Sequence, residues 1–182
     1  MGNKLEENTK TKLIDYFAEI VKEFEKSYML KTIALIKHLP NICRLHQLSL
    51  DNRKLRSEHP SKFHPIRPLR GEIFNALITE NIGSELCGNH LVIIISNDTG
   101  NIYAEKVNVL PIEGDGNKIN PNYQMQLSNS DLEWGNLDKN PSRIIFTDIL
   151  TIDKARLDIR VGKVKNEKIK DIAKKLHKQL NL

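Results

Sequence analysis

The chain contains few of the residues that mark several classes of protein. Its 182 residues include 2 cysteines and 1 tryptophan, and aromatic residues make up 5%. Cys43 and Cys87 are isolated, without ligand-like spacing, which argues against a disulfide framework and favours reduced thiols. No apolar run approaches the roughly 20 residues of a membrane helix, and the N-terminus lacks the apolar segment of a signal peptide. We therefore expect a cytoplasmic protein without membrane association.

Clusters of metal-binding residues are lacking as well. The six histidines are scattered, and His59 and His64, which flank a proline-containing stretch, have no ligand-like neighbours. We therefore expect no structural metal and no cofactor. Hydrophobic residues make up 39% and charged residues 28%, values that do not suggest a disordered chain. The length allows one ordinary domain with an appendage.

The net charge of +5 is unevenly distributed along the chain. Residues 1–67 carry 13 Lys and Arg against 8 Asp and Glu, residues 68–162 carry 8 against 13, and residues 163–182 carry 7 against 2. Two basic segments thus flank an acidic one. They either hold a polyanion such as a nucleic acid or only solvate helix faces, and for the C-terminal segment alone we favour the second reading.

The first third of the chain has a helical pattern. Residues 8–39 contain neither glycine nor proline, and apolar residues recur at three- and four-residue steps from Leu13 to Tyr28. This pattern predicts an amphipathic helix that Pro40 ends, followed by a short helix over 41–50 and a linker or strap. We place this helical extension at 1–67 and a second domain at 68–182. The apolar face packs on that domain, pairs with its copy in a dimer, or receives a partner; we favour the first two.

The second domain has the pattern of a small antiparallel sheet. Leu91 to Ile95 are all apolar, which is typical of a strand covered on both faces. Trp134 is expected to be a packing anchor in a loop, and Asp153, Lys154 and Arg156 to be structural turn residues. The expected strands cover 72–79, 90–96, 106–112, 123–127, 142–148 and about 159–164, with a final helix over 166–180. The predicted fold class is α+β, a small antiparallel barrel between helices.

Five segments of this domain resemble the successive signatures of one protein family. They are R-G-E-I at 70–73, G-S-E-x-x-G at 83–88, V-I-I-I-S-N-D-x-x-N at 92–101, V-N-V-L-P-I at 107–112 and T-I-D-K-x-R-L at 151–157. In this order and spacing they resemble the MazF/PemK toxins of type II toxin–antitoxin systems. The resemblance covers about residues 68–182 and leaves the N-terminal extension unmatched.

The resemblance implies a fold and a reaction. The expected fold is an SH3-like barrel that forms a homodimer, and the expected partners are single-stranded RNA such as mRNA and a cognate antitoxin protein, through whose complex DNA is bound. The expected activity is metal-independent, sequence-selective RNA cleavage that leaves 2′,3′-cyclic phosphate and 5′-hydroxyl ends. Such cleavage needs a base, an acid and a donor to the phosphate oxygens.

The two positions that matter most for this chemistry depart from the family pattern. His90 stands where the family usually carries an arginine, and Glu113 where it carries a threonine or serine. Either these two residues form an acid–base pair, or the site has decayed and the barrel is a catalytically silent module that binds RNA or protein. We favour the first reading, because both replacements are themselves titratable groups.

Six further residues are predicted to contact the substrate. Ser84 and Glu85 lie in the loop between the first two strands, where the family has a mobile lid. Asn97 is expected mainly to cap a turn, with binding as a second role. Of Thr147 and Asp148, only one can face the site, because adjacent strand residues point in opposite directions. Arg70 completes the set.

Overall fold

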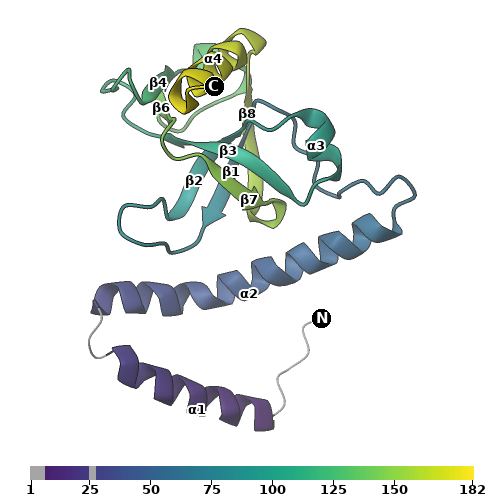
Figure 1. Cartoon of the computed structure of the whole chain (residues 1–182), viewed down its shortest axis with the longest axis vertical. Coiled ribbons are helices and arrows are strands. Elements are labelled where there is room, and N and C mark those ends of the chain that lie inside the picture. The colour runs from purple at the N-terminus through teal and green to yellow at the C-terminus, as the bar shows by residue number, and fades with distance from the viewer. Residues whose placement is uncertain (1–6, 25–27) are drawn as a thin grey trace. The chain divides into compact units, whose positions relative to one another are not determined.

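The computed structural model describes residues 7–24 and 28–182, and the chain forms two compact units, Met1–Pro40 and Asn41–Leu182 (Figure 1). The boundary lies within a helix, whereas the sequence analysis places it at 67/68. Within the described ranges, no helix is long and apolar enough to cross a membrane.

Two helices cover the first third of the chain. Helix α1 spans Glu7–Glu23 and helix α2 spans Met29–Glu58. The prediction that Pro40 ends a helix is wrong, because Pro40 lies inside α2 and the predicted linker from 51 to 58 is helical. A proline inside a helix removes one backbone hydrogen bond and costs about 3 kcal/mol. The helix-forming residues on both sides of Pro40 offset this cost.

The α1 helix buries none of its residues. Its expected apolar stripe is present, but Leu13 and Phe17 are each 41% exposed and Ile20 is 46% exposed. The stripe is therefore only partly covered by the residues that the structure describes.

The second unit is built on one curled antiparallel sheet (Figure 1). The described residues contribute eight strands, in the spatial order β4-β6-β3-β2-β1-β8-β5, with β7 pairing with β3. Their bounds are β1 Glu72–Ile78, β2 Gly88–Ile94, β3 Lys106–Glu113, β4 Gln124–Leu127, β5 Leu132–Gly135, β6 Ser142–Ile145, β7 Leu150–Asp153 and β8 Leu157–Val164. Short helices occupy Asp98–Tyr103 (α3), Asn129–Asp131 (η2) and Lys154–Arg156 (η3), and α4 spans Asn166–Leu180. The α+β class with helices at both ends of the chain is confirmed.

Both faces of the central strands are buried, as the sequence predicts. In β2, Ile93 belongs to the core cluster beneath α4, while Val92 and Ile94 belong to the cluster on the opposite face. Strand β3 extends this arrangement, because Leu110 and Ile112 join the first cluster and Val107 and Val109 the second. The consecutive apolar residues thus form two cores on one sheet.

Helix α4 covers the first core through one face. Ile172 is 1% exposed, and Ile169 and Leu176 pack beside it, whereas Leu180 at the end of the predicted face is exposed. Ile169 packs against Gly71, where a Cβ atom would lie 2.9 Å from Ile169 Cδ1. The φ angle of +86° at Gly71 also favours glycine.

Two predictions between 128 and 157 are corrected by the structure. Residues 132–135 form strand β5, not a loop, and Trp134 is 41% exposed, so it is not a core anchor. Gly135 permits the pairing with β8, since a Cβ atom there would lie 2.2 Å from the carbonyl oxygen of Val161. In contrast, Arg156 is structural as predicted, because its Nη1 donates to the carbonyl of Leu77.

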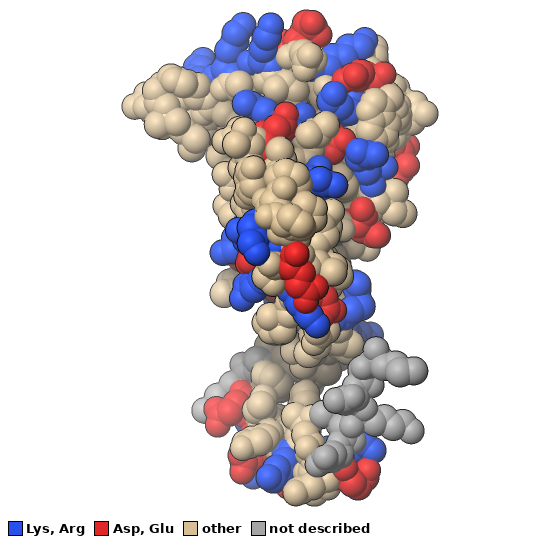
Figure 2. All heavy atoms as spheres, turned by 90° about the vertical axis from the view of Figure 1, so that its right-hand side faces the viewer, with Lys and Arg blue, Asp and Glu red and all other residues tan. Residues whose placement is uncertain are grey.

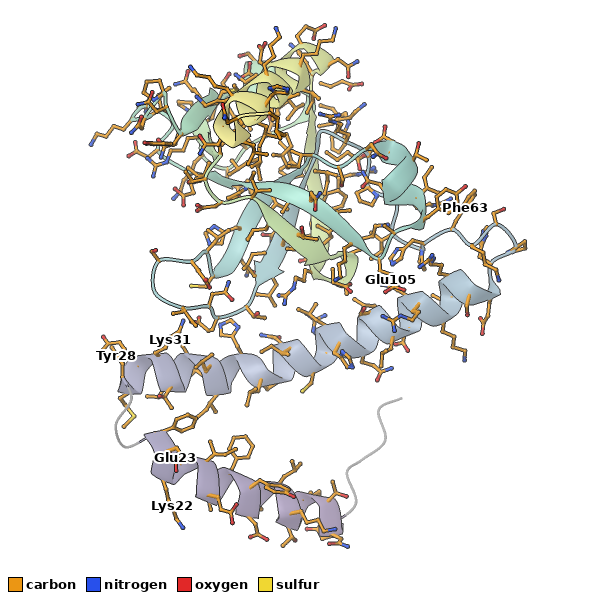
Figure 3. The ribbon with its side chains drawn as sticks, viewed as in Figure 1. Lys22, Glu23, Tyr28, Lys31, Phe63 and Glu105 are labelled. Atoms are coloured by element: carbon orange, nitrogen blue, oxygen red, sulfur yellow. The ribbon has the colours of Figure 1, made fainter. Side chains whose placement is uncertain are left out.

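The second half of α2 is attached to the sheet by polar contacts. Ser49 Oγ donates to Asp153 Oδ2 at 2.8 Å, and Arg53 and Arg56 both donate to Glu105. Figure 3 shows Glu105 directed towards this part of the helix. The chain after the helix lies as a strap against α3 and the sheet, because the amide of His64 donates to the carbonyl of Ile102 in α3 and Ile66 packs against the second core cluster. These contacts explain why residues 41–67 belong to the second unit.

Candidate active site

A row of polar side chains crosses four neighbouring strands. The ladder between β2 and β3 ends at the pair Leu91 and Ile112. Continued outward by one residue, the same register sets His90 opposite Glu113. Glu113 in turn pairs with Arg143 of β6, which pairs with Gln126 of β4. Directly opposite residues of antiparallel strands have Cβ atoms about 4.5–5.5 Å apart. The row therefore places an imidazole, a carboxylate and a guanidinium side by side.

The pleat of the sheet directs this row to the face opposite the core cluster beneath α4. The residues one position further along each strand, Leu91, Ile112, Ile144 and Met125, belong to or pack against the core cluster beneath α4. Because successive side chains of a strand alternate between faces, the polar row occupies the opposite face.

One pocket brings the two predicted catalytic residues together. Its volume is about 370 Å³, and it lies where β2 begins, β3 ends and the loop before β6 approaches. The lining residues are Asn89, His90, Leu91, Ile112, Glu113, Gly114, Asp138, Lys139 and Ser142. The sequence predicts His90 and Glu113 as a pair, and the structure places both in this pocket.

Arg143 holds the carboxylate of Glu113. Its Nη2 and Nε atoms donate to Glu113 Oε2 at 3.0 and 3.3 Å, and its Nη1 donates to the carbonyl of Lys118 at 3.1 Å. Both side chains of the ion pair are about one-quarter to one-third exposed. A fork of two hydrogen bonds fixes the carboxylate more firmly than a single contact. Glu113 Oε1 accepts no hydrogen bond from the described residues, so this oxygen is available to a substrate.

The ring of His90 is oriented by the loop that precedes its strand. His90 Nε2 lies 2.7 Å from the carbonyl oxygen of Cys87. A carbonyl oxygen only accepts, so Nε2 carries the hydrogen of this bond. Nδ1 has no hydrogen-bond partner in the part of the chain that the structure describes. It is the nitrogen that can exchange a proton with a ligand.

The other six predicted site residues do not line this pocket. The backbone amide of Arg70 donates to Asp98, and Glu85 accepts from the amide of Ile82 in the loop. Asn97 caps α3 by accepting from the amide of Gly100, in agreement with its predicted capping role. Thr147 and Asp148 follow β6, which ends at Ile145 and so is shorter than predicted. Ser84 is exposed in the loop between β1 and β2.

Sequence reasoning missed Arg143 and Lys139. Arg143 is the one charged residue in the short apolar strand β6, and that isolation is a usable signal. Lys139 lies in a loop of mixed polar residues and carries no such signal. Among the described residues, no group of three or more His, Cys, Asp and Glu is arranged to hold a metal ion.

Charges of both signs are interspersed over the face of the molecule that Figure 2 shows. Lysine and arginine side chains lie there among aspartate and glutamate side chains. In the second unit, Lys163 forms an ion pair with Glu133 and Lys168 with Asp131.

Comparison with known proteins identifies the family. Residues 69–180 match the model of the PemK-like, MazF-like toxins of type II toxin–antitoxin systems. The endoribonuclease MazF of Staphylococcus saprophyticus subsp. saprophyticus is 35% identical over 103 residues, which are 57% of this chain and 82% of that protein.

One solved structure supports the same fold, and a second is similar at a lower TM-score. An endoribonuclease from a mycobacterial species has a TM-score of 0.50 at 19% identity, over 64% of this chain and 93% of that chain. An endoribonuclease in complex with its cognate antitoxin, also mycobacterial, has a TM-score of 0.47 at 21% identity, over 64% of this chain and 95% of that chain. Because the family model covers more than half of the residues, the chain belongs to the PemK-like, MazF-like family of type II toxin–antitoxin toxins.

Proposed function

We propose that the protein is the toxin of a type II toxin–antitoxin system and cleaves single-stranded RNA without a metal ion. Its family and its endoribonuclease relative support this class of reaction. The observation that carries the proposal is the pocket that His90 and Glu113 share from adjacent strands. A base and an acid in one pocket are what cleavage by the ribose 2′-hydroxyl requires.

The proposed reaction is an internal transfer of the phosphate. The 2′-oxygen forms a bond to the adjacent phosphorus while the bond from phosphorus to the 5′-oxygen breaks. The base takes the proton of the 2′-hydroxyl, and the acid gives a proton to the 5′-oxygen. The products are a 2′,3′-cyclic phosphate and a 5′-hydroxyl, and no water is consumed.

The contacts of the two side chains favour one assignment of roles. The fork from Arg143 to Glu113 Oε2 suits a carboxylate, and Oε1 is available, so Glu113 is the base. His90 in its protonated form is the acid, and it donates from Nδ1 because Nε2 is engaged by Cys87. After the transfer, the two residues exchange protons with solvent and return to their starting states.

Substitution of each residue tests the proposal. General acid–base catalysis contributes roughly 10²–10⁴-fold, so His90→Ala and Glu113→Gln should each slow cleavage by that order while RNA binding is retained. The double variant should lose much less than the product of the two single losses, because the residues act as a unit. His177→Ala and Glu167→Gln, both exposed on α4 and outside the pocket, are matched controls. Cleavage by either single active-site variant at the wild-type rate would refute the assignment.

The pH profile provides a second test. One group must be deprotonated while the other is protonated, so the cleavage rate should rise and then fall with pH. The two limbs belong to the pair rather than to either residue. A rate that only rises with pH would argue for attack by hydroxide without the acid.

The alternative is a catalytically silent module that binds RNA or protein. Intact RNA that remains bound to the wild-type chain would support it.

For the toxin, we propose a homodimer formed through the sheets and a cognate antitoxin as partner; one mycobacterial structural relative was solved with its antitoxin. Light scattering that finds a monomer at micromolar concentration would contradict the homodimer.

A further inference from the structure

The pocket needs a third chemical group beyond the base and the acid. During the transfer, negative charge increases on the phosphate oxygens that keep their bonds to phosphorus, and a donor directed at them lowers the barrier. Arg143 is the guanidinium of the polar row, but three of its five N–H groups donate to Glu113 and to the carbonyl of Lys118. Arg143 is also not among the residues that line the pocket, so a cation that does line it is the better candidate.

Lys139 lines the same pocket as His90 and Glu113. Its ammonium group makes no hydrogen bond or ion pair with any residue that the structure describes, and neither does the carboxylate of Asp138 beside it. An ammonium group without a protein partner offers all three of its hydrogens to a ligand. Lys139 thus differs from Arg143, whose charge is already paired.

Gly114 leaves the space that the Lys139 side chain occupies. A Cβ atom at position 114 would lie 2.3 Å from Lys139 Cδ and 3.3 Å from its Nζ. The stem of the lysine therefore lies across the end of β3, directly after Glu113. Gly114 does not have a positive φ angle, so close approach, not backbone conformation, is what a side chain at this position would disturb.

The loop that carries Lys139 is held at several points. Ser142 Oγ donates to the carbonyl of Lys139 at 2.5 Å, the amide of Asn129 donates to Asn140 at 3.0 Å, and the amide of Gly116 donates to the carbonyl of Pro141 at 3.0 Å. These bonds fix the backbone from which the lysine extends. A donor that is positioned beforehand loses less conformational entropy when it binds its ligand.

We propose that Lys139 is a catalytic residue whose ammonium group binds a non-bridging oxygen of the scissile phosphate. This role rests on the proposed function, because it assumes that RNA occupies the pocket. Removal of one such donor costs about 10²–10³-fold in other enzymes. Lys139→Met should therefore slow single-turnover cleavage by that order. Lys139→Arg, which keeps a cation, should restore most of the rate.

Sulfur substitution distinguishes a phosphate contact from a structural role. In the wild type, replacing the contacted non-bridging oxygen of the scissile phosphate by sulfur should slow cleavage, and in Lys139→Met this sulfur effect should disappear. Lys170→Met removes an exposed lysine outside the pocket and serves as the control for overall charge. Cleavage by Lys139→Met at the rate of Lys170→Met, or an unchanged sulfur effect, would overturn the proposal.

Gly114→Ala tests the packing argument separately. Its methyl group should displace the lysine stem and slow cleavage, whereas Gly114→Ala combined with Lys139→Met should be no slower than Lys139→Met alone. Independent losses that multiply in the double variant would contradict the shared role.

A binding measurement keeps this proposal separate from the proposed function. Inorganic phosphate titrated into the full chain should shift the nuclear magnetic resonance signals of the His90 ring, and Lys139→Met should weaken that binding at least tenfold. This result supports the phosphate site even if the wild type fails to cleave RNA. Equal binding by both proteins, or none by the wild type, refutes the site.

Discussion

At the scale of single residues, the proposed chemistry depends on how Arg143 places Glu113. A different fork occurs outside the pocket, where Arg53 Nε and Nη2 donate to the two oxygens of Glu105 at 3.1 and 2.9 Å, whereas both bonds from Arg143 reach Glu113 Oε2. The two pairs differ in what surrounds them, since only Glu113 lies in the pocket with His90. Arg143 is therefore a positioning residue, and Arg53 is its structural counterpart.

Arg143→Lys tests whether Arg143 positions the carboxylate of Glu113. A lysine keeps the charge but cannot donate to Glu113 and to the carbonyl of Lys118 from one planar group. A misplacement of about 1 Å costs up to about 10²-fold in rate, so kcat should fall by roughly 10–100-fold while KM changes little. Arg53→Lys, which breaks the fork to Glu105 outside the pocket, should leave cleavage unchanged. Equal rates for the two variants would show that the fork to Glu113 is only structural.

The buried amino group of Lys154 makes the stability of the fold depend on pH. Its side chain is fully buried, and Nζ donates to the carbonyl of Asn101. Burial and the charge of Arg56 lower the pKa of Lys154 to about 8, against the raising influence of Asp153. In the unfolded chain the pKa of this lysine has its ordinary value of 10.5. Between about pH 8 and pH 10.5 the unfolded state therefore binds more protons than the folded state. The free energy of unfolding should therefore rise with pH through this window.

The expected rise is about 3 kcal/mol between about pH 8 and about pH 10.5, because one pKa unit corresponds to about 1.4 kcal/mol. Lys154→Met should abolish this component, and Lys170→Met should retain it. Urea unfolding of the three proteins across this range measures it. A wild-type curve parallel to that of Lys154→Met would contradict the argument.

The residues that could be predicted from the sequence are those whose partners follow from neighbouring strands. That His90 and Glu113 lie in one pocket could be predicted, because their motif positions fall at neighbouring ends of adjacent strands; their catalytic roles stay a prediction. The pairing of Glu113 with Arg143 joins strands 30 residues apart, and no local pattern encodes that register. Trp134 was misjudged because a large aromatic residue in a short edge strand can lie on either face.

At the scale of elements, helix α2 continues through Pro40, although a proline normally ends a helix. Pro40 was expected to end a helix, yet the helical residues on both sides, together with the anchors Ser49, Arg53 and Arg56, keep one helix from Met29 to Glu58. Strand β5 was missed because its four residues have no clear alternation, and its pairing with β8 stabilises it instead. The long apolar strands were predictable, since burial on both faces leaves an unambiguous pattern.

Pro40→Ala tests the weak point within α2. Proline has no amide hydrogen, so the helical bond to the carbonyl of Ile36 is missing, and Pro40 itself is exposed. Alanine should restore this bond and stabilise the local helix by up to about 3 kcal/mol. Hydrogen exchange of the amides from 37 to 43 should slow, while exchange in β2 stays the same. Unchanged exchange in both regions would show that the proline does not limit the helix.

At the scale of the whole molecule, a sheet with two cores carries the pocket of His90 and Glu113, and the first unit has an apolar stripe that is partly exposed. The antiparallel order of the strands brings the starts of β2 and β6 and the end of β3 to one place. This convergence, rather than any single motif, assembles the polar row. The fold could be predicted from the pattern and the family resemblance, whereas the complete set of pocket residues required the strand order.

The central claim is that this pocket cleaves RNA by internal transfer of the phosphate. The most direct measurement incubates the full chain with a mixed single-stranded RNA in excess EDTA and determines the ends of the products. We expect fragments with 2′,3′-cyclic phosphate and 5′-hydroxyl ends, formed by the wild type and the α4 controls but strongly reduced in His90→Ala and Glu113→Gln. RNA that stays intact, or fragments with 5′-phosphate ends, would contradict it.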